Sequence, residues 1–392
     1  MANYDTVKLG EVARSVSDTH PQRDGELIFL NTSDIARGQI LHRNYSPVKS
    51  MPGQAKKSVK SGDILFSEIR PANGRWALLR ESAEDFIVST KLMVIRPIDD
   101  RLDPLFLYQF LTNSETTAHL HLMAESRSGT FPQITFDEVA SLDIPFPPLN
   151  DQVRIASTIG ALDLKIESNQ NAQLVGRELL QALYLQSAES AEGQVMQIGS
   201  VLDESRAKVG KDFANSATVL SAVASGHLRK SDEQFNKQVY SKSIEKYLLV
   251  PPGCLAYNPA RANIGSIGIN DFQVNGAVSP VYVVAAIRQP WHSWIRTSLR
   301  TALFNQQVRT LSTGSVRQSI RYSDFASIEV PAPTLIALDN FNQQALDWFN
   351  LDQQLEHENQ RLERLRNALL PGLFSGRLRV SEPKGFGAGV MR

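Results

Sequence analysis

The sequence predicts an α+β protein in which two mixed α/β domains with twisted sheets are each followed by one long helix. Three observations predict this fold class. A series of short motifs occurs twice, in the same order, along the 392 residues. Each series ends in a strand that is stopped by prolines, and each of these strands is followed by 33 residues with the composition of a long helix. A repeat of this length indicates the architecture before any local assignment is made.

Length and composition agree with two core-bearing domains. The chain is longer than one typical domain of roughly 100 to 200 residues, and 42% of its residues are hydrophobic. The sequence has no run of eighteen apolar residues and no basic-then-apolar N-terminus, so we expect a soluble, cytoplasmic protein. Cys254 is the single cysteine, which excludes an intrachain disulfide and a cysteine-based zinc cluster.

The first elements of each repeat are predicted strands. A short apolar segment, expected to be a strand, opens the repeats at 7–12 and 196–201. A second strand, introduced by a glycine, follows at 62–66 (GDILF) and again at 253–257 (GCLAY). Apolar runs bounded by glycine turns are typical of strands, and a further apolar strand follows in each repeat.

The last element of each repeat is a strand that ends in prolines. These strands lie within 140–148 (ASLDIPFPP) and 326–333 (ASIEVPAP). Proline cannot donate a hydrogen bond to a sheet, so the prolines mark the ends of the two domains. The predicted organisation is domain 1 at 1–150, a first long helix at 151–190, domain 2 at 191–336, a second long helix at 337–376 and a flexible tail at 377–392.

The segments 152–184 and 338–370 contain no proline and read as the two long helices. In the first, the apolar pattern changes phase at Asn169, and Gly160 and Gly176 predict a weaker helix. The expected apolar positions of that helix are Ile155, Ile159, Leu162 and Ile166, followed by Ala172, Val175, Leu179 and Leu183. In the second, leucines and aromatic residues recur at the a and d positions of a coiled coil. These are Phe341, Trp348, Leu351, Leu355, Leu362, Leu365 and Leu369.

The helix lengths predict a mechanical role. At 1.5 Å per residue, 33 residues span about 50 Å. An antiparallel pair of such helices would hold the two domains at opposite ends and relate them by an approximate two-fold axis. Duplex DNA has a local dyad of the same kind, so this geometry favours a protein that measures distance along DNA.

The formal net charge is zero, which taken alone argues against a nucleic-acid partner. The charge is unevenly distributed, however. Residues 197–330 hold 15 Lys and Arg against 9 Asp and Glu, whereas residues 1–148 hold 16 against 19. In the first repeat the positive charge is clustered, with Lys56 and Lys57 in one group. Because such a cluster is more often an ordinary solvated face, it supports DNA binding without establishing it.

Two basic or glycine-bearing loops recur in each repeat and supply the candidate binding residues. Arginine suits guanine, asparagine suits adenine, and amides and hydroxyls can hold phosphates. The alternative is a structural turn stabilised by a salt bridge, and recurrence does not separate the two, because repeated folds repeat their turns. The candidate DNA-binding residues are Lys56, Lys57, Arg70, Asn73, Arg75, Ser128, Thr130, Gln133, Arg261, Asn263, Ser315, Arg317 and Gln318.

Motifs for catalysis and metal binding are missing from the sequence. It has no P-loop and no Gly-x-Ser-x-Gly elbow. The segment 257–260 (YNPA) lacks the second proline and the aromatic residue of an amino-methyltransferase motif. His119 and His121 have no third ligand nearby. We therefore expect no catalytic and no metal-ligating residues. A coiled-coil scaffold that does not touch DNA remains an alternative, since the helices alone would permit it.

Taken in order, the motifs resemble those of the specificity subunit of type I restriction-modification systems. The residues that carry the resemblance are those of 62–66 with Arg70 and Pro71, the loops at 129–130 and 314–318, and the helix end at 369–376 (LLPGLFSG). The resemblance covers nearly all of the chain. It implies that each domain is a target recognition domain that reads one half of an interrupted DNA sequence. We expect two non-identical half-sites, with the basic second domain contributing more of the electrostatic attraction.

The resemblance also implies partners. Two methyltransferase subunits would dock on the helices, and restriction and translocase subunits would join for cleavage. S-adenosylmethionine would belong to the methyltransferase, ATP and Mg²⁺ to the restriction subunit, and no cofactor to this chain, which would itself be non-catalytic. No membrane is implied. The predicted partner-binding residues are Ile159, Leu162, Ile166, Leu351, Leu355, Leu362 and Leu365.

Overall fold

The computed structural model divides into two compact units. Unit 1 comprises Met1–Asn169 and His357–Arg392, and unit 2 comprises Gln170–Glu356. Each unit thus includes part of both long helices, so its bounds differ from those of the domains and helices predicted along the sequence. No helix in the described part of the chain is long and apolar enough to cross a membrane. The described residues are 4–80, 82–98, 100–127, 132–223, 227–231, 244–312 and 319–380.

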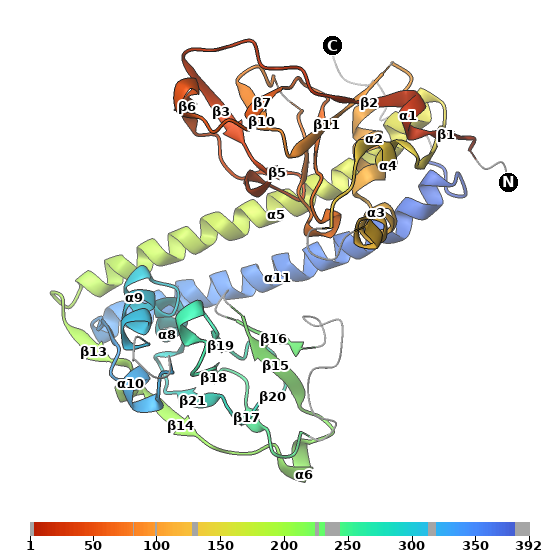
Figure 1. Cartoon of the computed structure of the whole chain (residues 1–392). Coiled ribbons are helices and arrows are strands. Elements are labelled where there is room, and N and C mark those ends of the chain that lie inside the picture. Colours follow the sequence, from red (N-terminus) through yellow and green to blue (C-terminus); the bar gives the residue numbers. More distant parts are fainter. Residues whose placement is uncertain are drawn as a thin grey trace, which may run out of the picture. The chain divides into compact units, whose positions relative to one another are not determined.

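Unit 1 contains two four-stranded sheets and two small two-stranded sheets (Figure 1). One large sheet has the order β2-β11-β8-β9 and is antiparallel throughout. The other has the order β6-β3-β10-β7, in which β3 and β10 run parallel. The small sheets pair β1 with β12 and β4 with β5. The strands are β1 (Thr6–Lys8), β2 (Ala13–Val16), β3 (Glu26–Leu30), β4 (Ile35–Ala36), β5 (Gln39–Ile40), β6 (Tyr45–Pro47), β7 (Ala55–Ser58), β8 (Ile64–Ser67), β9 (Trp76–Leu78), β10 (Phe86–Ser89), β11 (Leu92–Pro97) and β12 (Asp143–Pro145).

Helical segments of unit 1 connect these strands or follow them. Three short 3-10 turns lie between strands, and the longer helices come after β11. The segments are α1 (Leu9–Val12), η1 (Thr32–Asp34), η2 (Val48–Ser50), η3 (Pro71–Asn73), α2 (Pro104–Thr112), α3 (Ser114–Arg127), α4 (Phe136–Ala140) and α5 (Leu149–Glu189). Only the first part of α5, to Asn169, belongs to unit 1.

Unit 2 repeats this plan. Its large sheets have the orders β14-β21-β18-β19 and β16-β15-β20-β17, the parallel pair being β15 and β20, and β13 pairs with β22. The strands are β13 (Val195–Gln197), β14 (Leu202–Ser205), β15 (Thr218–Ala222), β16 (Leu228–Lys230), β17 (Leu248–Val250), β18 (Leu255–Tyr257), β19 (Ile267–Ile269), β20 (Gly276–Val278), β21 (Val283–Ile287) and β22 (Glu329–Pro331). The helical segments are η4 (Ile198–Val201), α6 (Gly210–Phe213), η5 (Ala262–Ile264), α8 (His292–Ser298), α9 (Ala302–Leu311), α10 (Tyr322–Ala326) and α11 (Leu335–Phe374).

Each unit has three layers, helices, sheet and sheet. In unit 1, Ile64 and Phe66 of β8 point into the core shared with α2, whereas Leu65 between them points into the core shared with β10. Unit 2 repeats the alternation, with Leu255 and Tyr257 of β18 in one core and Ala256 in the other. A strand covered on both faces must be apolar at consecutive positions, which explains the uninterrupted apolar runs. The predicted fold class is confirmed.

The predicted opening strands are shorter than expected. In both units the strand is followed at once by one helical turn, α1 or η4, that contains a glycine. A Cβ atom on Gly10 would lie 2.9 Å from the Ala140 Cβ, and one on Gly199 would lie 2.7 Å from the Ala326 Cβ. The turn therefore packs directly on α4 or α10, and only glycine leaves room for this contact.

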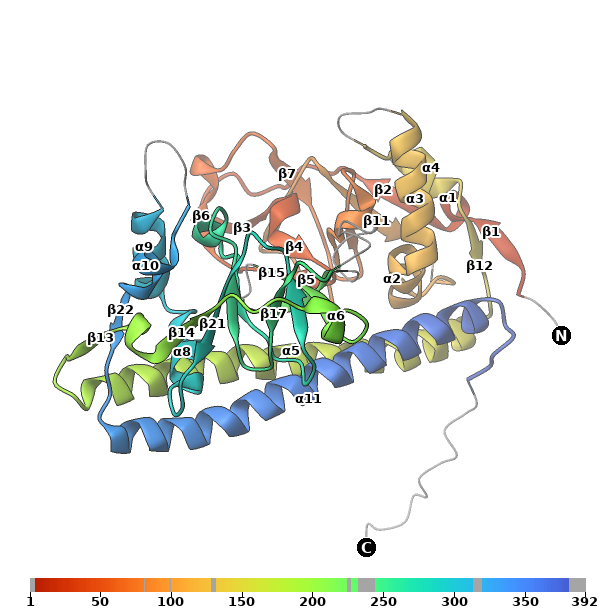
Figure 2. The ribbon, with the colours of Figure 1, turned by 90° about the horizontal axis from the view of Figure 1, so that it is seen from below.

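Both long helices are unbroken along their length (Figure 2). The glycines of α5 do not interrupt it. A Cβ atom on Gly176 would lie 2.0 Å from the Trp348 ring of α11, so glycine here permits close packing of the two helix segments in unit 2. Gly160 faces more open space, because a Cβ atom added there would lie 3.4 Å from Leu105 Cδ2.

Within each unit the segments of α5 and α11 run antiparallel, but the predicted apolar seam is partly wrong. In unit 2 the buried positions are Leu180 and Tyr184 of α5 against Phe341, Ala345 and Phe349 of α11. The predicted seam residues Val175, Leu179 and Leu351 are 62%, 60% and 45% exposed. The seam departs from the leucine heptads because polar residues occupy the buried positions where the apolar pattern breaks.

One of these polar layers explains the phase change at Asn169. In unit 1 the buried Asn169 amide donates hydrogen bonds to Asn359 Oδ1 at 2.9 Å and to Glu358 Oε2 at 2.8 Å. Lys165 Nζ lies 3.4 Å from the same Glu358 oxygen. The break in the apolar pattern is therefore a buried hydrogen-bonded layer of a continuous helix pair.

Candidate nucleic-acid interface

The recurrent basic loops fold alike in the two units. After β8 the chain turns through η3, with Arg70 at its start and Gly74 at its end. After β18 it turns through η5, with Arg261 at its start and Gly265 at its end. Both closing glycines are left-handed, with φ of 69° and 88°. The repeated sequence motif is therefore a repeated 3-10 turn at the same place in both folds.

The turn of unit 1 lies beside the second candidate loop. The Arg70 amide donates to the Pro132 carbonyl at 3.0 Å, and Ile69 forms a β-bridge with Gln133. The side chains of Arg70, Asn73 and Gln133 are all exposed. The structure thus brings three predicted residues together on one surface.

Unit 2 joins the equivalent segments. The Ile320 amide donates to the Pro259 carbonyl at 3.1 Å, which places the chain after 313–318 next to the turn. Arg261 is exposed and Asn263 is half-buried. The remaining predicted residues of these loops, Ser128, Thr130, Ser315, Arg317 and Gln318, lie outside the described residues.

Two predicted residues have roles within the fold. Lys57 Nζ donates to the Leu92 carbonyl at 2.8 Å, and burial lowers its pKa. Arg75 Nη1 donates to the Ser33 carbonyl at 3.2 Å and to the Ile35 carbonyl at 3.0 Å. Both half-buried side chains therefore hold neighbouring segments together, and their assignment as DNA contacts stays a prediction. Lys56, by contrast, is exposed on β7.

Arg37 is an exposed cation at the η3 turn that the sequence did not indicate. Its amide donates to the Gly74 carbonyl at 2.6 Å, and its φ of 45° is left-handed. The Arg37-Gly38 pair is typical of a turn, but no local pattern shows which distant loop that turn meets.

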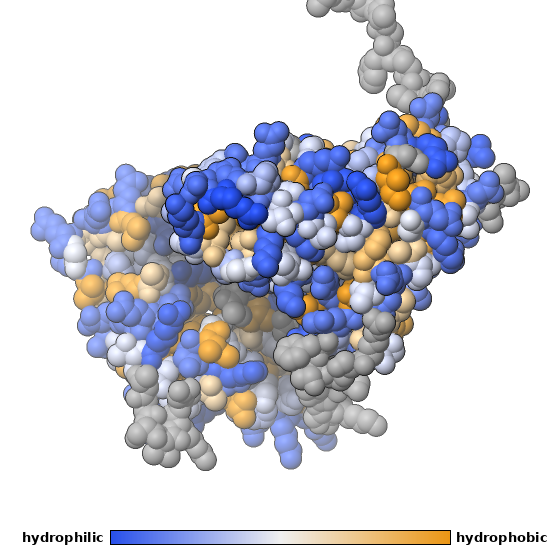
Figure 3. All heavy atoms as spheres, turned by 45° about the horizontal axis from the view of Figure 1, so that its top comes forward, coloured by the Kyte–Doolittle hydropathy of each residue, from blue (hydrophilic) through white to orange (hydrophobic). Residues whose placement is uncertain are grey.

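The predicted partner-binding residues fall into two groups. Ile159 and Ile166 are 1% and 7% exposed within unit 1, so they belong to its interior and cannot present apolar surface to another subunit. Leu351 and Leu365 are 45% and 46% exposed. Leu162, Leu355 and Leu362 are half-buried. On the face seen in Figure 3, hydrophobic residues are scattered among hydrophilic ones.

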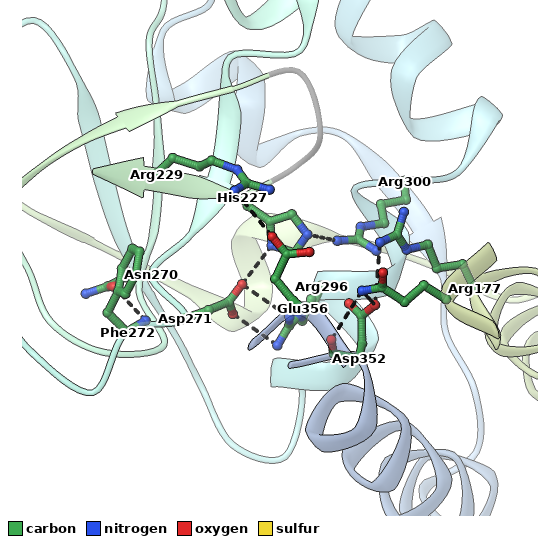
Figure 4. Close-up of polar contacts among 11 residues, drawn as sticks. Arg177, His227, Arg229, Asn270, Asp271, Phe272, Arg296, Arg300, Asp352 and Glu356 are labelled. Atoms are coloured by element: carbon green, nitrogen blue, oxygen red, sulfur yellow. Dashed lines mark hydrogen bonds and ion pairs between the residues drawn. The ribbon is translucent and has the colours of Figure 1, made fainter. Parts of the chain in front are cut away.

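A cluster of charged side chains in unit 2 was also missed (Figure 4). His227 Nδ1 lies 2.8 Å from Asp271 Oδ2, and Arg296 Nη1 lies 3.0 Å from Asp271 Oδ1. Arg300 contacts the other ring nitrogen of His227. An Nδ1–H that donates to Asp271 leaves Nε2 to accept from Arg300, so the contacts favour one neutral tautomer of the histidine.

The surroundings of Asp271 favour its charged form. Burial alone would raise its pKa, but the hydrogen bond from His227 and the charge of Arg296 outweigh burial and lower it. On the helix pair, Arg177 Nη2 lies 3.4 Å from Asp352 Oδ1, which also accepts from Gln173 at 2.8 Å. The cluster could not be predicted from the sequence, because its members come from five separated parts of the chain. In the described part of the molecule, no three His, Cys, Asp or Glu side chains are grouped to hold a metal ion.

Comparisons with known proteins find similarity over part of the chain. The family model described as the type I restriction modification DNA specificity domain matches residues 1–175. Over 189 residues, 47% of this chain, the sequence is 42% identical to the type I restriction enzyme HindI specificity subunit of Haemophilus influenzae. It is 28% identical over 111 residues, 28% of this chain, to the putative type I restriction enzyme MjaX specificity subunit of Methanocaldococcus jannaschii. The matched regions span 40% and 26% of these relatives.

A solved structure shares the fold of nearly the whole chain. The crystal structure of the type I restriction-modification system S subunit from M. genitalium covers 95% of this chain, and this chain covers 96% of that one. The TM-score is 0.58 at 13% sequence identity, so the likeness concerns the fold alone. The family resemblance inferred from the repeated motifs is confirmed for the part of the chain that the family model matches, residues 1–175.

Proposed function

We propose that this chain, whose residues 1–175 match the type I restriction modification DNA specificity domain, is a specificity subunit that recognises a two-part DNA sequence. Unit 1 would read one half of the site and unit 2 the other. The observation that carries the proposal is the repeated 3-10 turn, which presents Arg70 and Asn73 in unit 1 and Arg261 and Asn263 in unit 2. Arginine and asparagine are the side chains best suited to guanine and adenine edges.

The proposed role is recognition, with the chemistry supplied by partners. Methyltransferase subunits, which would bind S-adenosylmethionine, and restriction subunits, which would use ATP and Mg²⁺, are the partners that we propose. Leu351 in unit 2 and Leu365 in unit 1 are exposed, and we propose that each contacts a methyltransferase subunit. We place the assembled complex in the cytoplasm, where its DNA would be found.

Single and paired substitutions test the proposed DNA contacts. In the full chain assembled with its methyltransferase partner, we expect Arg70→Ala and Arg261→Ala each to weaken binding to the cognate duplex by about 5- to 100-fold, as loss of a bidentate base contact would. The measurement is a titration of labelled duplex at fixed salt concentration. Each variant should relax selectivity in one half-site and leave the other half-site unchanged.

The controls separate base reading from simple attraction. Arg361→Ala removes an exposed arginine of α11 and should leave affinity for the duplex unchanged. A uniform weakening on every DNA sequence would assign Arg70 and Arg261 to phosphates rather than to bases. Unselective or absent duplex binding by the wild-type complex would contradict the proposed function and favour a scaffold.

A further inference from the structure

A pocket of 240 Å³ lies in unit 2 between α8 and the paired segments of α5 and α11. Three arginines line it: Arg177 from α5 and Arg296 and Arg300 from α8 and the turn after it. The remaining wall is largely apolar and includes Leu174, Leu180 and Phe349. The pocket therefore joins a concentration of guanidinium groups to a hydrocarbon surface (Figure 4 shows the three arginines).

Two of the three arginines at the pocket form an ion pair with an aspartate. Arg177 pairs with Asp352 at 3.4 Å and Arg296 with Asp271 at 3.0 Å. Arg300 contacts the His227 ring and, among the described residues, lies beyond ion-pair distance of every carboxylate. One guanidinium is thus left without a counter-ion in a partly buried place.

The surroundings of Arg300 disfavour its charged form. Burial, together with the charges of Arg296 and Arg177, lowers the pKa of Arg300 to about 10. Like charges held close together in a place of low solvation are unfavourable unless an anion joins them. An anion in the pocket would give Arg300 a charged partner.

An unsatisfied donor lies at the same place. In the described part of the chain, Nε of Arg296 is buried and has no hydrogen-bond partner. Its guanidinium carbon stands 3.9 Å from the centroid of the Phe349 ring, so the group is held flat against one wall. Glu178 also lines the pocket, but its side chain is exposed and forms no ion pair with these arginines. The chain thus leaves a buried donor and an unpaired cation at one cavity.

We propose that this pocket binds a carboxylate carried on a short aliphatic stem, with Arg177 and Arg300 holding the carboxylate and the apolar wall covering the stem. Guanidinium groups match the two oxygens of a carboxylate in a bidentate geometry. Leu174, Leu180 and Phe349 give the stem an apolar surface. A phosphate fits less well, because at least one of its charged oxygens would face this hydrocarbon wall.

The test uses the full chain and glutarate, a dicarboxylate with a three-carbon stem, as the probe. Isothermal titration should give saturable binding of glutarate by the wild type. Glutaramide has the same shape without charge and should bind at least tenfold more weakly, because charge-assisted hydrogen bonds are lost. Inorganic phosphate should also bind at least tenfold more weakly than glutarate.

Variants locate the binding at the pocket. Arg300→Gln and Arg177→Gln should each reduce glutarate affinity at least tenfold, whereas Arg309→Gln, which removes an exposed arginine of α9 in the same unit, should leave it unchanged. Arg177 is 47% exposed, so Arg177→Gln is the variant that best preserves folding, which circular dichroism would verify for all three. Equal affinity of the wild type and both pocket variants would overturn the proposal, as would tighter binding of phosphate.

A second arm distinguishes the two sources of such a carboxylate. The same titration is repeated on the chain assembled with its proposed methyltransferase partner. Retained glutarate binding identifies a site for a free carboxylate. Binding that is lost in the complex, and restored when acidic residues of the partner are neutralised, identifies an acidic side chain as the natural occupant. The pocket proposal does not depend on DNA recognition, since the first arm contains neither DNA nor partner.

Discussion

Units 1 and 2 share a framework but use different polar interactions to hold it. In unit 1 the Gly62-Asp63 pair opens β8, and the fully buried Asp63 accepts two hydrogen bonds from Arg96 at 2.6 and 2.7 Å. In unit 2 the matching pair is Gly253-Cys254, and the thiol replaces the carboxylate. There the charged side chains gather instead where the recognition domain meets the helix pair. The apolar strands are common to both units, whereas the ion pairs, Asp63–Arg96 in unit 1 and Asp271–Arg296 in unit 2, lie at different places in the fold.

The contact between domain and helices is partly alike in the two units. Both pack aromatic rings there: Phe374 against Phe106 and Phe110 in unit 1, and Tyr184, Trp294 and Phe341 against one another in unit 2. Unit 1 adds neutral amides, because Gln109 Nε2 donates to the Ala156 carbonyl at 2.9 Å and Gln152 Nε2 to the Pro147 carbonyl at 2.9 Å. Unit 2 adds the Arg296 guanidinium, which lies over the Phe349 ring. The same arrangement of strands and helices is therefore stabilised by different side-chain contacts in the two units.

The largest expected effect comes from the ion pair of unit 1. Asp63→Asn would leave the Arg96 guanidinium, which is 14% exposed, without its counter-charge. Removing one partner of a buried pair costs about 3 kcal/mol or more. We expect native-state hydrogen exchange to show this loss in the free energy of opening of β8 and β11, while β18 and β21 keep their protection. An equal loss of protection in both units would show that the two units do not unfold separately. The control is Asp212→Asn, which changes an exposed carboxylate.

The next effect belongs to the helix pair of unit 2. Gly176→Ala would place a methyl group against the Trp348 ring, and we expect a destabilisation of about 2 kcal/mol from overpacking. Gly160→Ala in unit 1 meets no such obstacle and should stabilise α5 by up to about 1 kcal/mol through helix propensity. Urea denaturation of both variants measures the difference. If the two substitutions changed stability in the same direction, the close contact at Gly176 would not be what selects glycine.

The smallest effect is a pH dependence confined to unit 2. Because the folded-state pKa of Asp271 is lowered, its contribution to stability is fully present above the unfolded value of about 3.9 and is lost as the pH falls through the folded value. Asp271→Asn has already lost this contribution, so its stability should vary less than that of the wild type below about pH 4. Acid titration followed by tryptophan fluorescence in a Trp76→Phe background, in which the remaining tryptophans Trp291, Trp294 and Trp348 all lie in unit 2, measures it. Parallel curves for variant and wild type would exclude Asp271 as the group responsible.

The features that could be predicted from the sequence are those that depend on local pattern. The strands around Leu65 and Ala256 are apolar at consecutive positions, and the prolines after β12 and β22 end their strands wherever they occur. The turns that follow Arg70 and Arg261 were found because a motif recurs. Each of these signals lies within a few neighbouring residues.

What could not be predicted depends on contacts between distant segments. Lys57 resembles any basic surface residue until its acceptor, 35 residues away in the chain, is known. The helix seam was misplaced because the buried residues are Asp352 and Asn359, each one residue after a position of the predicted heptad, Leu351 or Glu358. The arginine pocket is assembled from α5, α8 and α11, and no spacing in the sequence indicates that these elements meet.

The small sheets β1-β12 and β13-β22 have a consequence for how such a protein can change. In each unit the first strand pairs with the last, for example Val7 with Ile144 and Met196 with Val330. The two points at which the intervening segment joins the rest of the chain are therefore neighbours, as in domains that tolerate insertion and circular permutation. We expect that the segment between the paired strands can be replaced by another of the same fold without altering the helices.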